Sequence, residues 1–150
     1  MEKLNISPKD WSNINDWDKL VILKKALSKQ EYANVVKDWY INTEFIHTDL
    51  QKWKDTFHSL KKPELLMDYE ELNVFKNLPE KITIYRGSYS RWGISWTLNK
   101  DIAEWFATRF KAVNKIETVN TQVFKQEVYR DNCIAYFNDR EEEEIIYLGE

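Results

Sequence analysis

The chain has 150 residues, with 22 Lys and Arg against 25 Asp and Glu, so its formal net charge is -3. The basic residues are scattered along the sequence rather than gathered into a stripe, which argues against nucleic acid as a partner. We find neither an apolar run long enough to cross a membrane nor a signal-peptide pattern, so no membrane partner is expected.

The front of the chain, residues 1–78, has the pattern of a helical region. "SKQE", residues 28–31, is a capping box, a motif whose first and last side chains bond to the backbone at a helix start. Apolar residues then recur at helical spacing, at Tyr32, Val35, Val36, Trp39 and Tyr40. Weaker versions of this period predict a helix over residues 16–27, a helix carrying Leu50, Trp53, Phe57 and Leu60, and a helix or turn from Pro63 through Leu65, Leu66, Tyr69 and Leu72. We expect these aromatic stripes to form core rather than a binding surface.

After Pro79 the apolar period changes from helical to alternating. "KITIYRG", residues 81–87, predicts a half-buried strand that ends at a glycine, and "WGISWT", residues 92–97, predicts a second strand. Asn99 is suited to cap a helix, one face of which carries Ala103, Phe106, Ala107 and Phe110.

The rest of the chain predicts more short strands. A polar connection is expected over residues 111–120, and strands are expected near 119–128, 133–137 and 144–148. With no internal repeat and no low-complexity linker, we predict one α+β domain over residues 1–150. Its helical N-terminal region is followed by a mostly antiparallel, split β-sheet core over residues 79–150, with a cleft between the two halves of the sheet.

The last predicted strand follows an acidic run, "DREEEEIIYL", residues 139–148. Such runs are commonly solvated turns or tails, but this one lies between two apolar segments that read as neighbouring strands. In a strand, alternate side chains share a face, so Glu142 and Glu144 would point the same way and Glu143 the other. The pattern therefore presents Glu142 and Glu144 as a candidate catalytic pair, with Glu141 and Glu143 in the solvated turn.

Several common chemistries lack their motifs. Cys133 is the single cysteine, which rules out an internal disulfide framework and is typical of the reducing cytoplasm. His47 and His58 lack metal-ligand spacing, so no metal site is expected, and a buried structural role is the better interpretation of each. No glycine-rich nucleotide motif of the Rossmann or P-loop type is present.

Three features remain, and their order carries a resemblance. Arg86 ends the first strand in "YRG", Ser95 and Thr97 lie on the second in "SWT", and "EEE" precedes Ile145 at the start of the last. Over about the last 70 residues the chain resembles the ADP-ribosyltransferase fold of the Arg-Ser-Glu clade, which includes the arginine-specific toxins. The resemblance suggests a small bacteriophage or bacterial member. Trp96 departs from the usual Ser-Thr-Ser pattern, but alternation points it away from the face of Ser95 and Thr97.

The resemblance implies a mono-ADP-ribosyltransferase that uses NAD as co-substrate and modifies a target protein of unknown identity, for example on arginine. It assigns the stabilisation of the cationic ribose to Glu144, the positioning of Glu144 to Ser95, and the acceptor to Glu142. Arg86 would bind the pyrophosphate or the adjacent ribose, and the backbone of Gly87 would approach the nicotinamide amide. Thr97 would complete the NAD-binding strand.

Two other functions stay open. The same fold could serve as a non-catalytic interaction module, acting through the Trp-rich N-terminal helices. Alternatively, the enzyme could be an NAD glycohydrolase that transfers nothing to protein. NAD binding, nicotinamide release and label transfer distinguish the three.

Overall fold

The computed structural model describes residues 5–43, 46–114 and 121–149. The elements in chain order are α1 (Pro8–Ser12), α2 (Asp16–Ala26), α3 (Lys29–Ile41), η1 (Ile46–Asp49), α4 (Leu50–His58), η2 (Pro63–Leu66), α5 (Tyr69–Lys76), β1 (Lys81–Ser88), β2 (Ser95–Thr97), α6 (Lys100–Asn114), β3 (Gln122–Tyr129), η3 (Arg130–Asn132), β4 (Ala135–Phe137) and β5 (Glu144–Ile146). The chain divides into two compact units, Met1–Leu66 and Met67–Glu150, which we call the helical unit and the sheet unit. This division places α5 with the strands, whereas the change of period predicts the boundary near residue 79.

In the helical unit, side chains cap the starts of α2 and α3, and the cap of α3 is the one that the sequence predicts. The Ser28 hydroxyl accepts a hydrogen bond from the Glu31 amide at 3.1 Å, and the Glu31 carboxylate accepts one from the Ser28 amide at 3.0 Å. The predicted capping box of α3 is therefore confirmed. At the start of α2, the Asn15 side chain accepts from the Asp18 amide at 2.9 Å and satisfies one of the free donors there.

Aromatic rings fill the core of the helical unit. The ring of Tyr40, on α3, meets Trp53 and Phe57 of α4 edge to face, at centroid distances of 5.4 and 5.2 Å. All three side chains are buried. The interpretation as core is confirmed for these three residues of α3 and α4, and edge-to-face contacts add to the free energy gained by burial.

The segment after Pro63 forms two elements rather than one. The 3-10 turn η2 ends at Leu66, and a second capping box between Asp68 and Glu71 starts α5. Tyr69, expected on the apolar face of a helix or turn that starts at Pro63, lies in the first turn of α5 and is 86% exposed. The expected periodicity therefore fails here because the new cap resets the helix phase.

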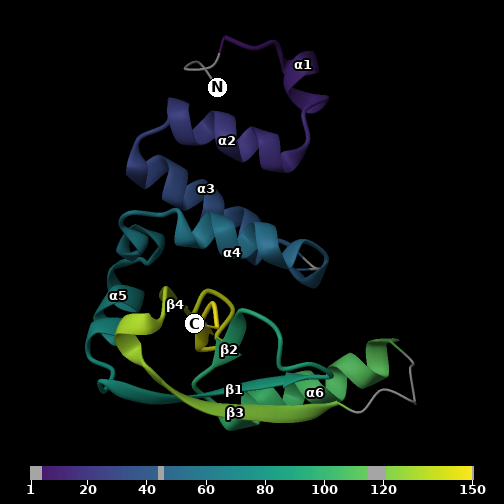
Figure 1. Ribbon diagram of the computed structural model, residues 1–150, viewed down its shortest axis with the longest axis vertical. Helices are drawn as coiled ribbons and strands as arrows, with labels where there is room; N and C mark the ends of the chain where they lie inside the picture. The colour runs from purple at the N-terminus through teal and green to yellow at the C-terminus, as the bar shows by residue number, and fades with distance from the viewer. Residues whose placement is uncertain (1–4, 44–45, 115–120, 150) are drawn as a thin grey trace. The chain divides into compact units, whose positions relative to one another are not determined.

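The sheet unit holds one five-stranded antiparallel sheet in the order β3-β1-β2-β5-β4, so the α+β class is as predicted (Figure 1). The described strands pair into a single sheet rather than into the two separate halves that the sequence suggests. Its two parts differ in length. β1 and β3 pair along their full length from Lys81↔Tyr129 to Ser88↔Gln122, whereas β2, β5 and β4 have three residues each. The pair Tyr85↔Thr97 joins β1 to β2. The predicted second strand, residues 92–97, is thus shortened to Ser95–Thr97.

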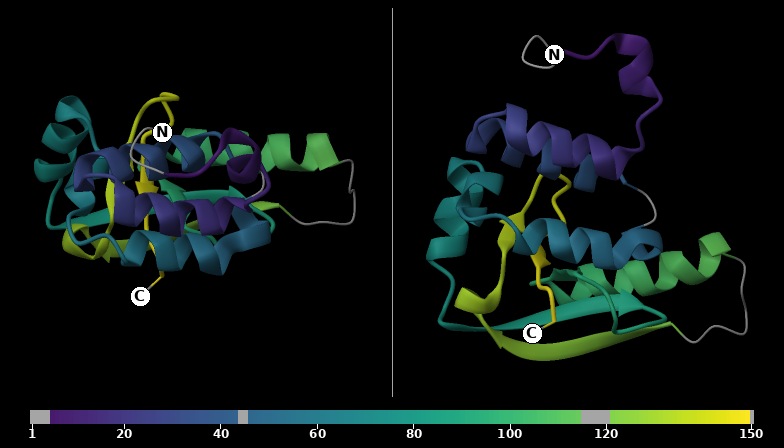
Figure 2. Two further views of the ribbon diagram at one scale, coloured as in Figure 1. Left: turned by 90° about the horizontal axis from the view of Figure 1, so that it is seen from above. Right: turned by 45° about the horizontal axis from the view of Figure 1, so that its top comes forward.

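Helix α6 runs beside β1, as Figures 1 and 2 show. Asn99 caps it, because its side-chain oxygen accepts from the Asp101 amide at 2.9 Å. The helix continues to Asn114, so the prediction of a polar connection from residue 111 is wrong for 111–114. The rest of that connection, residues 115–120, and the first two residues of the strand expected near 119–128 lie outside the described residues.

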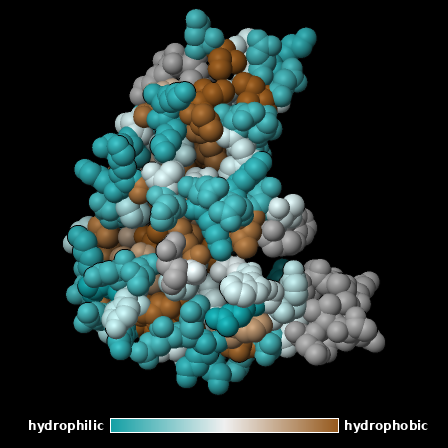
Figure 3. Space-filling model, in the orientation of Figure 1, coloured by the Kyte–Doolittle hydropathy of each residue, from teal (hydrophilic) through white to brown (hydrophobic). Residues whose placement is uncertain are grey.

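Apolar side chains also reach the surface of the sheet unit. On the face drawn in Figure 3, hydrophobic residues show between hydrophilic ones. Separately from that view, the large aromatic side chains exposed in the sheet unit include Tyr89, Trp92 and Trp105, and such scattered exposure is ordinary for a folded domain. Within the described part of the chain, no helix has the length and apolar character that crossing a bilayer requires.

Candidate functional site

The central feature of the candidate site is a hydrogen bond between neighbouring strands. The Ser95 hydroxyl, on β2, donates to Oε2 of Glu144, on β5, at 2.6 Å. The register pairs Thr97 with Glu144 and Ser95 with Ile146, so the side chains of Ser95 and Glu144 leave the same face of the sheet. Glu144 is only 3% exposed, and a short bond to a buried carboxylate is of the strong, charge-assisted kind. The carboxylate of Glu144 is therefore held in one orientation.

Trp96 lies on the opposite face from Ser95, as alternation predicts. Its side chain is buried, and its indole nitrogen donates to the Gly93 carbonyl at 3.1 Å. The large ring thus packs behind the strand and does not occupy the space beside Glu144.

Arg86 reaches this site through the backbone of Ser95. Its Nη1 donates to the Ser95 carbonyl at 3.0 Å and its Nε to the Ser90 carbonyl at 3.1 Å. Because Tyr85 is the residue opposite Thr97, alternation starts the Arg86 side chain from the other face of β1. The guanidinium therefore holds the loop between β1 and β2 in place, and it contacts the backbone of Ser95 rather than the Ser95 side chain.

The acidic run forms a tight turn ahead of β5. Glu141 and Glu143 have positive φ angles of 57° and 47°, which non-glycine residues seldom adopt. Strand β5 starts only at Glu144, so strand alternation does not set the direction of Glu142, although its carboxylate and that of Glu144 meet the same guanidinium. The turn's left-handed residues, and not a strand pleat, decide where the Glu142 carboxylate points.

Arg140, to which no sequence motif assigns a role, lies between the two glutamates. Its Nη2 lies 3.1 Å from Oε1 of Glu144 and 3.5 Å from Oε2 of Glu142. The Arg140 side chain is 42% exposed, whereas that of Glu142 is 26% exposed and that of Glu144 only 4%. One guanidinium thus lies between a buried carboxylate and a half-buried one. The sequence signal for this role is the spacing, since Arg140 precedes Glu142 by two positions and Glu144 by four.

Neighbouring polar groups fasten the turn to β2. The Thr97 hydroxyl donates to the Glu142 carbonyl at 2.8 Å and accepts from the Asn99 amide at 3.1 Å. The Asn99 side-chain nitrogen donates to the carboxylate of Glu143 at 3.1 Å. Glu143 is therefore half-buried rather than solvated as expected, whereas Glu141 is exposed as expected. Thr97 holds the turn that carries Glu142.

The environment of Glu142 changes its acidity. Burial raises the pKa of this carboxyl, the nearby Arg140 lowers it, and the charge of Glu144 raises it, with a net rise. Burial disfavours the charged form of a carboxyl, so Glu142 holds its proton to higher pH than an exposed glutamate does. A carboxylate with a raised pKa is a stronger base than an ordinary glutamate and accepts a proton more readily.

The packing of α6 on β1 requires a glycine at position 87. A Cβ built on it would lie 1.7 Å from the Ala103 carbonyl oxygen of α6, so no larger residue fits here. Its neighbour along the strand, Arg86, likewise needs Gly93, because a Cβ there would lie 2.3 Å from the Arg86 guanidinium carbon. Both glycines therefore have packing reasons that are independent of any ligand.

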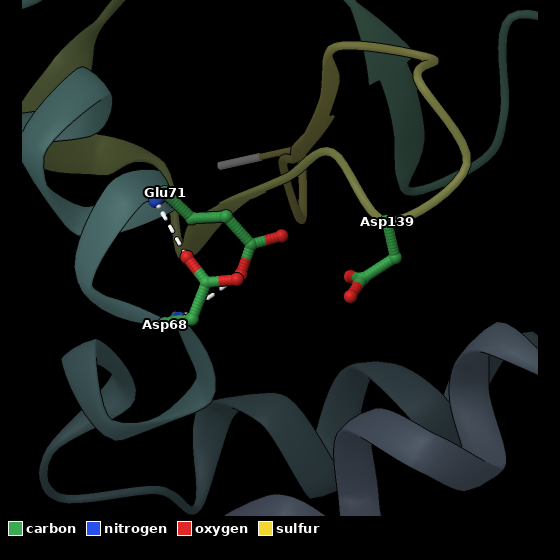
Figure 4. Close-up of side chains that lie close together, drawn as sticks. All are labelled: Asp68, Glu71 and Asp139. Carbon is green, nitrogen blue, oxygen red and sulfur yellow. Dashed lines mark hydrogen bonds between the residues drawn. The ribbon is translucent and has the colours of Figure 1, made fainter.

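A second acidic cluster in the sheet unit has a structural explanation. Asp68, Glu71 and Asp139 each offer an oxygen within 4.8 Å of the others, and Figure 4 shows their side chains facing one another. Asp68 and Glu71 form the capping box of α5, and the Glu71 carboxylate also accepts from the Asn138 amide at 2.7 Å. The cluster thus joins the start of α5 to the loop after β4.

The histidines add no chemistry to the described site. His58 ends α4 in the helical unit and is exposed, so its expected burial is wrong. His47 lies in η1, and its side chain lies outside the described residues.

Comparisons of the chain with protein-family models, with curated proteins and with solved structures gave no match. The candidate site therefore rests on the geometry of this chain's own residues.

Proposed function

We propose that this chain is a mono-ADP-ribosyltransferase that cleaves NAD between nicotinamide and ribose. It transfers ADP-ribose to a target protein, such as to an arginine side chain, and it acts in the cytoplasm. We also propose that the α+β core has the ADP-ribosyltransferase fold.

One observation carries the proposal: Glu144 is a buried carboxylate held by the Ser95 hydroxyl at 2.6 Å. Cleavage of the nicotinamide bond leaves positive charge on the ribose. A fixed carboxylate stabilises this charge more in the transition state than in the substrate, which is what lowers the barrier. The same carboxylate can accept a hydrogen bond from a ribose hydroxyl.

The other residues have supporting roles in this proposal. The permanently charged guanidinium of Arg86, one hydrogen bond from the Ser95 backbone, supplies positive charge that suits the pyrophosphate of NAD. Thr97 positions the turn of Glu142. Glu142 accepts a proton from the acceptor guanidinium, which its raised pKa favours. The backbone of Gly87 is assigned to the nicotinamide amide.

A second candidate is a non-catalytic module with the same architecture. The contacts of Arg86 favour it, because this guanidinium already donates to two backbone carbonyls and leaves β1 from the face opposite Ser95. A purely structural Arg86 would explain those contacts without NAD. NAD binding by isothermal calorimetry separates the two candidates.

The test of the proposal is nicotinamide release, measured together with transfer of labelled ADP-ribose to a cell extract. Glu144→Gln keeps the size of the side chain but removes its charge, so release should fall by about a hundredfold. Glu142→Gln should reduce transfer strongly and leave NAD hydrolysis largely intact. In hydrolysis the acceptor is water, so no acceptor guanidinium has to lose its proton to Glu142. Glu141→Gln, an exposed neighbour in the same turn, is the matched control and should change neither activity.

Each contrary result has a distinct meaning. Full activity in Glu144→Gln would refute the role of this carboxylate. No binding of NAD and no release by the unaltered protein would favour the non-catalytic module. Release without transfer to any protein would make the chain an NAD glycohydrolase.

A further inference from the structure

The two carboxylates that the proposed function assigns to catalysis already hold a guanidinium. Nη2 of Arg140 contacts Glu144 at 3.1 Å and Glu142 at 3.5 Å, and the side chain is 42% exposed. We infer that Arg140 occupies the place of the acceptor guanidinium and is itself a site of ADP-ribosylation in cis. This inference rests on the proposed function and names an acceptor that the chain supplies.

The arrangement predicts what moves when NAD binds. The ribose needs the Glu144 carboxylate, so the contact of Arg140 with this buried group must be given up. The contact with Glu142 can persist, because Glu142 lies in the turn and is less buried. Arg140 is then paired with the residue that takes the acceptor proton, two positions away in the chain.

The transfer step balances without any further reagent. One guanidinium nitrogen of Arg140 attacks C1′ of the ribose and forms the new C–N bond. The bond from C1′ to the nicotinamide nitrogen breaks, and its electron pair leaves with neutral nicotinamide. The proton displaced from the guanidinium passes to Glu142 and then to water.

The tether favours this reaction over transfer to another molecule. A group held beside the reacting atom acts at a high effective concentration, since its translational and rotational freedom is already lost. Modification in cis should therefore proceed at a rate per molecule that does not change with protein concentration. A guanidinium also offers several nitrogens, so one can stay paired with Glu142 while another attacks.

The experiment incubates the full chain with NAD and follows intact mass, peptide mapping and nicotinamide release together. The expected result is one added ADP-ribose per chain, on the peptide with Arg140. Its rate should stay unchanged when the protein is diluted about tenfold, because the reaction is intramolecular. Arg140→Gln should lose this adduct. Arg140→Lys keeps the positive charge between the carboxylates but has a single nitrogen, so it should lose the adduct.

Arg109→Lys is the matched control, because Arg109 is an exposed arginine on α6 that packs over Trp105 at 5.1 Å. It should retain the adduct on Arg140. Nicotinamide release without an adduct on Arg140, or an adduct that persists in Arg140→Lys, would overturn this inference and leave the proposed function standing. Absence of nicotinamide release from the unaltered chain would overturn the proposed function and this inference with it.

Discussion

Replacing Ser95 with alanine removes one hydroxyl and, with it, the 2.6 Å hydrogen bond to the carboxylate of Glu144. Glu144 is 3% exposed, so water cannot easily replace the lost donor. A hydrogen bond to a buried charged group contributes about 1.5 to 3 kcal/mol, and we expect the free energy of unfolding of the sheet unit to fall by that amount.

Native-state hydrogen exchange measures this loss within the sheet unit. The amides of Leu98 and Tyr147 donate to the carbonyls of Glu143 and Ile94, at 3.1 and 3.0 Å, and both bonds lie beside the site. Their protection against exchange reports the free energy of opening this part of the sheet.

Ser88→Ala is the matched control for Ser95→Ala. Ser88 is also buried, but its hydroxyl oxygen accepts only a 3.5 Å bond from the Ser90 amide, at the outer limit for a hydrogen bond. Its loss should cost less than about 1 kcal/mol. If both variants lose the same stability, the bond between Ser95 and Glu144 does not hold the carboxylate and the reasoning fails. In a Glu144→Gln background the cost of Ser95→Ala should shrink, because the partner is no longer charged.

Three further expectations concern the same unit. Gly87→Ala forces a Cβ against the Ala103 carbonyl at 1.7 Å and should lower the free energy of unfolding by about 3 kcal/mol, measured by urea denaturation; a loss below about 1 kcal/mol would contradict the packing of α6 on β1. Burial raises the pKa of the Cys133 thiol to about 12, so native protein should resist thiol reagents that label it once unfolded, and stability should fall as pH rises from near 9 towards 12. Burial also raises the pKa of Glu142 above its usual 4.5, so on raising the pH the unfolded chain releases this proton before the folded chain does. The free energy of unfolding should therefore decline as the pH rises above 4.5. Glu142→Gln should remove this part of the pH dependence.

Local patterns in the sequence were sufficient to predict much of the fold. The cap at Ser28 and the helical spacing from Tyr32 to Tyr40 depend only on residues within two turns of one another, and α3 forms as predicted. The alternation in residues 81–87 likewise predicts β1 to within one residue. Helix α6 runs past its expected end and continues to Asn114.

The geometry of the candidate site required the tertiary structure. Ser95 and Glu144 are 49 positions apart, and only the pairing of β2 with β5 brings them within 2.6 Å. The bridging by Arg140 depends on two left-handed residues in the acidic turn, a backbone choice that the charges alone do not encode. The face from which Arg86 leaves its strand is set by register with β2. Side-chain periodicity encodes which residues are buried together, whereas strand pairing and turn conformation decide which atoms meet, because both depend on contacts between distant segments.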